Sequence, residues 1–220
     1  MNRRQALGAT LALAGGRVLA PQLLHAIEPK RKRLAAVNSV YYKLSHAYHI
    51  VGRFVNGYNL RGEVHHPAFD VVRMFNHQTI KDLTKPLVEK ANVKIVPTIA
   101  DALGGKANLD VDGVLMIVEH GDYPRNDRGQ ILYPRYEFFQ QIVEVFKASG
   151  RSVPVFIDKH LSFDHVKARG MYDTAQKMGF PIMAGSSLPV TWRRPEWELP
   201  HGAKVEEAVV CFYEIGRAHV

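Results

Sequence analysis

From Leu34 onward, short apolar runs alternate with longer segments whose apolar residues recur every three or four positions. The short runs have no polar face, which is typical of strands that are buried on both sides of a sheet. We predict six strands from them, at 33–40, 69–76, 93–98, 111–119, 153–158 and 180–187.

The longer segments have the period of helices and stand between the predicted strands. We predict helices at 45–58, 79–91, 98–105, 133–150 and 163–179. Ser45 is a suitable N-cap for the first helix, and Gly150 ends the fourth. Buried strands separated by helical crossovers form a parallel sheet covered on both faces, so the pattern predicts a doubly wound α/β domain over 34–195.

The first 26 residues have the pattern of a targeting segment. Arg3 and Arg4 precede a short run rich in alanine and glycine, and "LHA" at 24–26 resembles the end of a cleavable signal. The run is too short to cross a bilayer, so we expect no stable membrane anchor. The arginine pair resembles a twin-arginine signal and predicts export to the periplasm or the medium. A cytoplasmic N-terminal helix is the alternative.

Composition excludes several classes of protein. The single cysteine, Cys211, rules out an intrachain disulfide framework and a thiolate zinc cage. The formal net charge is +8, but much of it comes from the first 26 residues and from "KRKR" at 30–33. We interpret 27–33 as a basic linker. Because no basic stripe is interleaved with aromatic residues, we expect no nucleic-acid partner.

The C-terminal segment suggests a truncated reading frame. "EIGRAHV" at 214–220 resembles the translation of a sequencing adapter, so we interpret it as a non-native tail. The residues before it, 196–213, are then the start of a truncated second α/β domain. A genuine C-terminal strand is the alternative, although it would leave a sheet edge unpaired.

Polar residues gather where the predicted strands end, which is where a doubly wound sheet binds its ligands. "VPVFIDKH" runs apolar and then ends in Asp158, Lys159 and His160. The other strands contribute further ionisable or polar groups to the same rim, namely His46, His49, Asn76, His77, Glu119, His120 and Asp122. Such a density of ionisable groups at one edge is typical of a functional site.

Three stretches, "TIADAL", "VDGVLMIVEHGDY" and "SGRSVPVFIDKH", stand in the order of motifs found in a known family. From Arg33 to Pro195 the chain resembles the N-terminal, Rossmann-like domain of the Gfo/Idh/MocA superfamily of NAD(P)-dependent sugar and inositol oxidoreductases. The first stretch is similar to its short helix that ends in Asp/Glu-Ala-Leu, the second to its Val-Asp-Ala-Val strand, and the third to its Gly-Lys-x-Val segment followed by Glu-Lys-Pro. The resemblance implies an oxidoreductase, or a related NAD-using hydrolase, that acts on a sugar or polyol, with a homo-oligomer possible for the full-length protein.

Carried over to this chain, the resemblance makes Lys159 the lysine that touches the substrate hydroxyl and the cofactor ribose. Asp158 replaces the family's glutamate, and His160 stands where the family has a proline. We expect Lys159 and Asp158 to be catalytic, with His120 or His160 carrying the proton. Ser45, His46, Asn76 and Glu119 are the positions expected to contact NAD or NADP.

The first loop departs from the family. Its Gly-x-Gly-x-x-Gly fingerprint is replaced by "NSVYYKLSHAYHIVG", with no glycine until Gly52, and we expect Tyr41 and Tyr42 to crowd a dinucleotide phosphate. Residues 125–128 could form a lid that contacts a polyol or an acidic sugar. The alternative is a solvated surface turn, because "PRNDRG" is rich in turn-forming residues. The alternative function is a cofactor-free hydrolase with a divalent metal on His46, His49, Glu119, His120 and His160, or a sugar-binding module. No compact metal motif supports the metal version.

Overall fold

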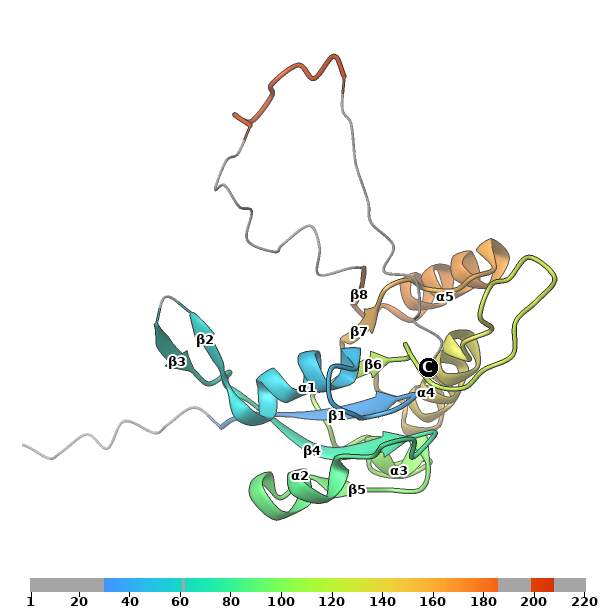
Figure 1. Ribbon diagram of the computed structural model, residues 1–220. Helices are drawn as coiled ribbons and strands as arrows, with labels where there is room; N and C mark the ends of the chain where they lie inside the picture. Colours follow the sequence, from blue (N-terminus) through green and yellow to red (C-terminus); the bar gives the residue numbers. More distant parts are fainter. Residues whose placement is uncertain (1–29, 61, 186–198, 208–220) are drawn as a thin grey trace, which may run out of the picture. The chain divides into compact units, whose positions relative to one another are not determined.

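The computed structural model describes residues 30–60, 62–185 and 199–207 (Figure 1). Contacts divide the chain into Met1–Arg31 and Lys32–Val220, and the sheet lies within the second unit. The predicted targeting segment at 1–26, the tail at 214–220 and half of the 196–213 segment lie outside the described residues. No described helix has both the length and the apolar character needed to cross a bilayer.

Six parallel strands form one sheet in the order β5-β4-β1-β6-β7-β8. Their bounds are β1 (Lys32–Asn38), β4 (Phe69–Asn76), β5 (Lys94–Ile95), β6 (Gly113–Ile117), β7 (Val155–Asp158) and β8 (Ile182–Gly185). The order reverses between β1 and β6, as it does in a Rossmann sheet. The predicted doubly wound fold and its six strands are therefore confirmed.

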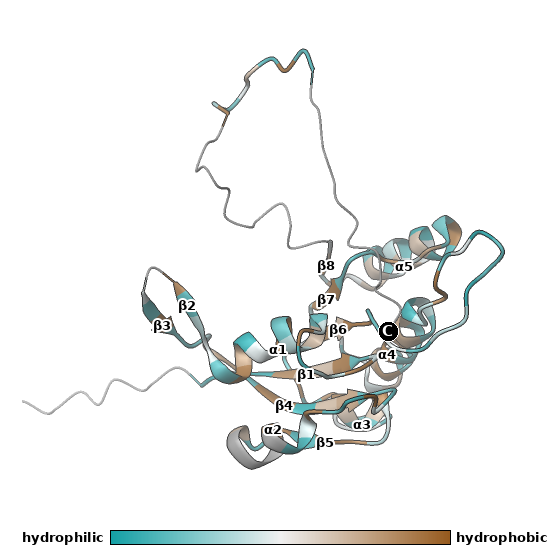
Figure 2. Cartoon of the chain, in the orientation of Figure 1, coloured by the Kyte–Doolittle hydropathy of each residue, from teal (hydrophilic) through white to brown (hydrophobic). Residues whose placement is uncertain are grey.

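Helices cover both faces of this sheet. The elements are α1 (His46–Asn56), α2 (Thr84–Ala91), α3 (Ile99–Leu103), α4 (Arg135–Ser149) and α5 (His165–Met178). Residues of α1 and α2 share one buried cluster with β1 and β4, whereas α3, α4 and α5 share another with β1, β6 and β7. Figure 2 shows the apolar strands enclosed between these helices.

The strands form because their side chains can be buried on both faces. On β1, Leu34 and Ala36 pack toward α1, while Ala35 and Val37 pack toward α3 and α4. All five residues of β6 are buried. Each fully buried large aliphatic side chain contributes about 1.5–3 kcal/mol, so the central strands hold the sheet together and fix where their carboxyl ends lie.

One element was not predicted. β2 (Tyr58–Leu60) and β3 (Glu63–His65) form an antiparallel hairpin outside the main sheet. The predicted first helix continued to Tyr58, but it ends at Asn56, because Gly57 adopts a φ of 77° and sits against the carbonyl of His65. A side chain at Gly57 would collide with that carbonyl, so glycine is required at this turn.

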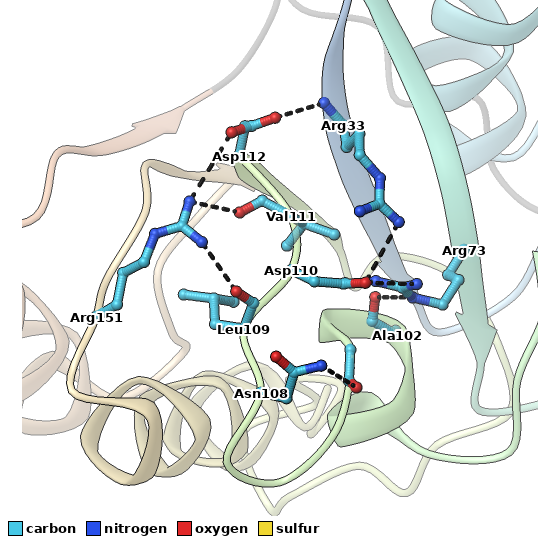
Figure 3. Close-up of polar contacts among 10 residues, drawn as sticks. Arg33, Arg73, Ala102, Asn108, Leu109, Asp110, Val111, Asp112 and Arg151 are labelled. Carbon is cyan, nitrogen blue, oxygen red and sulfur yellow. Dashed lines mark hydrogen bonds and ion pairs between the residues drawn. The ribbon is translucent and has the colours of Figure 1, made fainter.

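The amino ends of the strands are tied by arginine and aspartate (Figure 3). β1 begins at Lys32, so two residues assigned to the basic linker 27–33 belong to the sheet. Arg33 donates its backbone N–H to Asp112 at 2.9 Å and pairs with Asp110 at 3.3 Å. Arg73 also pairs with Asp110, and Arg151 donates to two carbonyls of the same segment at 2.8 and 3.1 Å. This network fixes the edge opposite the candidate site.

Candidate functional site at the carboxyl edge

The structure brings several predicted site residues together at the carboxyl edge. Asp158 is the last residue of β7 and His46 is the first residue of α1. His46 Nδ1 lies 2.5 Å from Asp158 Oδ2, and the His46 ring meets the His120 ring edge-on with centroids 4.9 Å apart. Residues 112 positions apart in the sequence are therefore neighbours in one group.

The environments of Asp158 and His46 differ. The Asp158 side chain is 5% exposed, whereas that of His46 is 30% exposed. A carboxylate this deeply buried needs a polar partner, and the imidazole supplies one. With Nδ1 held by the carboxylate, Nε2 is the ring nitrogen available to exchange a proton with another group.

Arg135, which the sequence analysis did not single out, anchors this site from α4. It is 2% exposed, pairs with Glu119 and donates from Nη2 to the carbonyl of Lys159 at 3.1 Å. Its guanidinium lies 4.7 Å from the centroid of the Tyr133 ring. Burial lowers the pKa of Arg135, and the charge of Glu119 opposes that change. Arg135 precedes buried Phe138, Phe139 and Ile142 at helical spacing, which was the signal that could have revealed it.

Lys159 and His160 follow β7 directly. The Lys159 carbonyl is held by Arg135, and the Lys159 side chain is half-buried. The peptide bond between Lys159 and His160 is cis. His160 is exposed, and its Nδ1 lies 2.8 Å from the carbonyl oxygen of Ser162.

A cavity of about 490 Å³ opens between the ends of β6 and β7 and the loop at 124–134. Four predicted site residues line it, namely Glu119, His120, Lys159 and His160. Tyr133 and Phe163 add aromatic surface. His46 and Asp158 do not line the cavity. His46 nevertheless contacts His120, which does line it. The walls of the cavity are thus mostly polar and charged, with aromatic surface on one part of them.

The predicted lid is divided between two cavities. Arg125 lines the one just described, and its Nη1 donates to the Gly129 carbonyl at 2.6 Å. Asn126, Asp127 and Arg128 instead line a neighbouring cavity of about 380 Å³. The side chain of Asn126 accepts the N–H groups of Arg128 and Gln130, so the turn is shaped by its own contacts.

All four predicted cofactor contacts are engaged within the chain. Ser45 is fully buried, and its hydroxyl oxygen accepts the N–H of Tyr48 at 3.1 Å and that of Tyr42 at 3.3 Å. Asn76 accepts a hydrogen bond from Asn38 Nδ2 at 3.1 Å. The other two, His46 and Glu119, bind Asp158 and Arg135.

The expectation for Tyr41 is wrong. We expected it to crowd a phosphate, but it is buried in the core beneath α1, beside Gly52. This burial raises its pKa to about 12. Tyr41 turns into the core because burying its aromatic ring there is more favourable in free energy than leaving the ring at the loop surface. Tyr42 does face the site, with its ring 5.9 Å from that of His120.

No protein-family model matches the chain, and neither does any curated protein. Solved structures do. Biliverdin reductase from Synechocystis sp. PCC 6803, in complex with biliverdin and NADP+, is similar at 12% identity with a TM-score of 0.44 over 71% of this chain. A 3-ketoreductase mutant from Actinomadura kijaniata, in complex with TDP-benzene and NADP, is similar at 14% identity with a TM-score of 0.42 over 69%. The super-repressor mutant of Gal80p from Saccharomyces cerevisiae is similar at 12% identity with a TM-score of 0.45 over 68%.

The chain spans 37%, 36% and 33% of the length of these three structures. The strand order of the sheet is the Rossmann order that the resemblance to the Gfo/Idh/MocA superfamily implied. The chain therefore contains a Rossmann-like α/β domain whose candidate site lies at the carboxyl edge of the sheet.

Proposed function

We propose that this domain binds a hydroxylated small molecule, a sugar or a polyol, in the cavity beside Lys159, and that the chain is an oxidoreductase-like protein. The observation that carries the proposal is the wall of that cavity. It places an ammonium group, imidazoles and a carboxylate next to the aromatic rings of Tyr133 and Phe163. Aromatic surface can cover the C–H face of a sugar, while the polar groups orient its hydroxyls.

The residues of the chain can carry a proton-transfer step in this cavity. The Lys159 ammonium can stabilise an alkoxide that forms on a bound ligand. His120 lines the cavity and can accept the hydroxyl proton, with His46 in contact behind it. The backbone of Lys159 is held by buried Arg135, which supports a fixed position for its side chain.

NAD or NADP, expected from the resemblance, would accept a hydride from such a substrate. The residues at the expected pyrophosphate position do not fit it in the family's manner. The loop before α1 has no glycine before Gly52, and the Ser45 hydroxyl already takes two of the backbone N–H groups there. No step of the proposal passes through a dinucleotide.

The same observation favours a second candidate, a sugar-binding module that uses no cofactor. Its metal-dependent version lacks support, because residues 30–60, 62–185 and 199–207 contain no group of three or more histidine, cysteine, aspartate or glutamate residues that could hold a metal ion. A sugar-binding module would bind the same ligands in the same cavity without turnover.

Export belongs to the proposal and is supported by the sequence of the first 26 residues. A reporter fused to those residues should leave the cytoplasm, and changing Arg3 and Arg4 to lysine should stop it. Export of the lysine variant through the general secretory route would contradict the twin-arginine assignment. Self-association of the protein is likewise proposed, and sedimentation tests it.

Calorimetry with a panel of ligands tests the proposed function. We would titrate the chain with D-glucose, D-gluconate, myo-inositol and xylitol. At least one should give saturable heat, and Phe163→Ala should weaken that binding by removing aromatic surface. Absence of saturable binding for all four at millimolar concentration would reject a sugar or polyol site.

A further inference from the structure

The crevice at the carboxyl end of β1 is where a doubly wound domain holds a dinucleotide. β1 lies between β4 and β6, next to the point where the strand order reverses. A dinucleotide in this position extends across the end of β1, with its pyrophosphate at the N-terminus of the first helix. The contacts of the loops that follow β4, β1 and β6 therefore decide whether the position is open.

A two-bond bridge joins the loops on either side of β1. Gln78, which follows β4, donates from Nε2 to the carbonyl of Asp122 at 2.9 Å. The N–H of Asp122, which follows β6, donates to Gln78 Oε1 at 2.8 Å. Because β4 and β6 flank β1, this bridge passes over the carboxyl end of β1.

The residues at the end of β1 are bonded into this cover. Ser39 donates from Oγ to the Glu119 carbonyl at 2.7 Å, and its own carbonyl accepts the N–H of Gln78 at 2.9 Å. Ser39 and Asn38 are both 0% exposed. The chain itself therefore buries both positions at the end of β1.

Aromatic packing extends the bridge. The rings of His77 and Tyr123 are stacked at 5.9 Å with an interplanar angle of 11°, and His77 Nδ1 lies 2.9 Å from the Tyr123 hydroxyl. A Cβ on Gly121 would lie 2.6 Å from the Tyr123 ring and 3.0 Å from Gln78 Oε1. Only a residue without a side chain lets the loop approach this closely.

One N–H group of the first turn of α1 and one of the loop before it are also engaged. An anion at a helix N-terminus is held by backbone N–H groups of the first turn and of the loop before it. Ser45 supplies an internal acceptor there, since its hydroxyl takes the N–H groups of Tyr48 and Tyr42. Half-buried Tyr42 then lies against His120 on the β6 side.

We infer that the chain's own residues occupy the dinucleotide position, so that this domain binds its ligand without NAD or NADP. The bridge joins the loop after β4 to the loop after β6. The cavity lies between the ends of β6 and β7, away from the end of β1 that the bridge covers. A ligand can therefore enter the cavity without disturbing the bridge. The inference is independent of which small molecule the cavity takes. It favours the second candidate, the sugar-binding module, over an oxidoreductase, because hydride transfer from a sugar or polyol needs an acceptor such as a dinucleotide.

Two measurements on the whole chain test it. Titration of NADH and NADPH, followed by their fluorescence, should show no saturable binding up to millimolar concentration. In hydrogen exchange, the amide of Asp122 should exchange slowly in the protein alone, and NADH should leave its protection unchanged. A micromolar dissociation constant for either dinucleotide, or an Asp122 amide that exchanges as fast as an open loop, would overturn the inference.

A variant links the exchange to the bridge itself. Gln78→Ala removes both hydrogen bonds to Asp122, so its amide should exchange at least about tenfold faster, as expected for a locally opened loop. Gln176→Ala, at an exposed position on α5, is the matched control and should leave the Asp122 amide unchanged. Equal exchange in the two variants would show that Gln78 does not close the crevice, against the inference.

Discussion

His46 at the start of α1 and Asp158 at the end of β7 form a hydrogen-bonded pair across the point where the strand order of the sheet reverses. α1 packs with the β1 and β4 side of the domain, whereas β7 belongs to the opposite half. The pair therefore depends on both halves being in place, and it lies directly behind His120 at the cavity.

Asp158→Asn should disrupt this pair while keeping the side chain at position 158 the same size. An amide is a weaker partner for the ring than a carboxylate, so we expect a loss of about 1–3 kcal/mol in the free energy of unfolding, measured with urea. The Nδ1–H tautomer of His46, read from nitrogen NMR shifts, should become less populated. His49→Gln, an exposed position on the same helix, is the control. An unchanged His46 tautomer in Asp158→Asn would argue against a positioning role for the carboxylate.

Lys159→Met should separate function from stability. The Lys159 side chain is half-buried at the rim and packs little, so the free energy of unfolding should change by less than about 1 kcal/mol. Affinity for whichever sugar or polyol binds should nevertheless fall by at least about tenfold, which is 1.4 kcal/mol. Lys177→Met, on the exposed side of α5, should change neither quantity. Unaltered ligand affinity in Lys159→Met would remove Lys159 from the site.

Arg135→Met should destabilise the protein strongly, because it leaves Glu119 and the Lys159 carbonyl without their buried partner. Removing one member of a buried pair costs about 3–5 kcal/mol, and partial exposure of Glu119 reduces this to about 2–4 kcal/mol. Arg169→Met breaks an exposed pair with Asp173 on α5 and should cost less than about 1 kcal/mol. Urea unfolding of both variants gives the comparison. Similar losses would mean that Arg135 is not an anchor.

Alkaline pH should destabilise the protein through Tyr41. Burial raises the pKa of Tyr41 to about 12, whereas an unfolded tyrosine ionises near pH 10. Stability from the buried neutral phenol is thus complete below pH 10 and is lost as the pH rises toward 12. Between pH 10 and pH 12, the free energy of unfolding of the wild-type protein should therefore fall by about 1–3 kcal/mol more than that of Tyr41→Phe.

Urea unfolding across this pH range measures the difference, with Tyr172→Phe, an exposed tyrosine, as the control. Parallel losses in wild type and Tyr41→Phe would indicate that Tyr41 ionises as it does in the unfolded chain.

Sequence alone could predict the sheet, because its strands are buried on both faces and produce unbroken apolar runs. The run that became β6 is buried at every position. The β2–β3 hairpin escaped prediction because its three-residue strands have no buried residue, so no period of two separates an inner from an outer face.

For the site, the sequence could predict which residues lie at the carboxyl edge of the sheet but not which of them contact one another. Strand ends marked Asp158, Lys159 and His120 as neighbours, since parallel strands end at one edge. Which of them pair could not be read from the chain, because the His46 contact depends on how α1 packs. Tyr41 was misplaced for the same reason. It follows a strand as a loop residue does, yet its ring turns into the core below α1.

The Ser45 cap has a consequence for how such domains are recognised. A loop whose backbone amides must reach a phosphate needs glycine at fixed spacing. A loop whose amides bond to its own serine is free of that constraint. In this loop a residue with a side chain, Leu44, adopts the positive φ of 70° that glycine would otherwise provide. Glycine spacing is then no longer a reliable fingerprint of this fold. Relatives that share the cap should be sought by a buried serine before the first helix, the histidine that follows it, and an aspartate that ends the strand two places beyond β1 in the sheet.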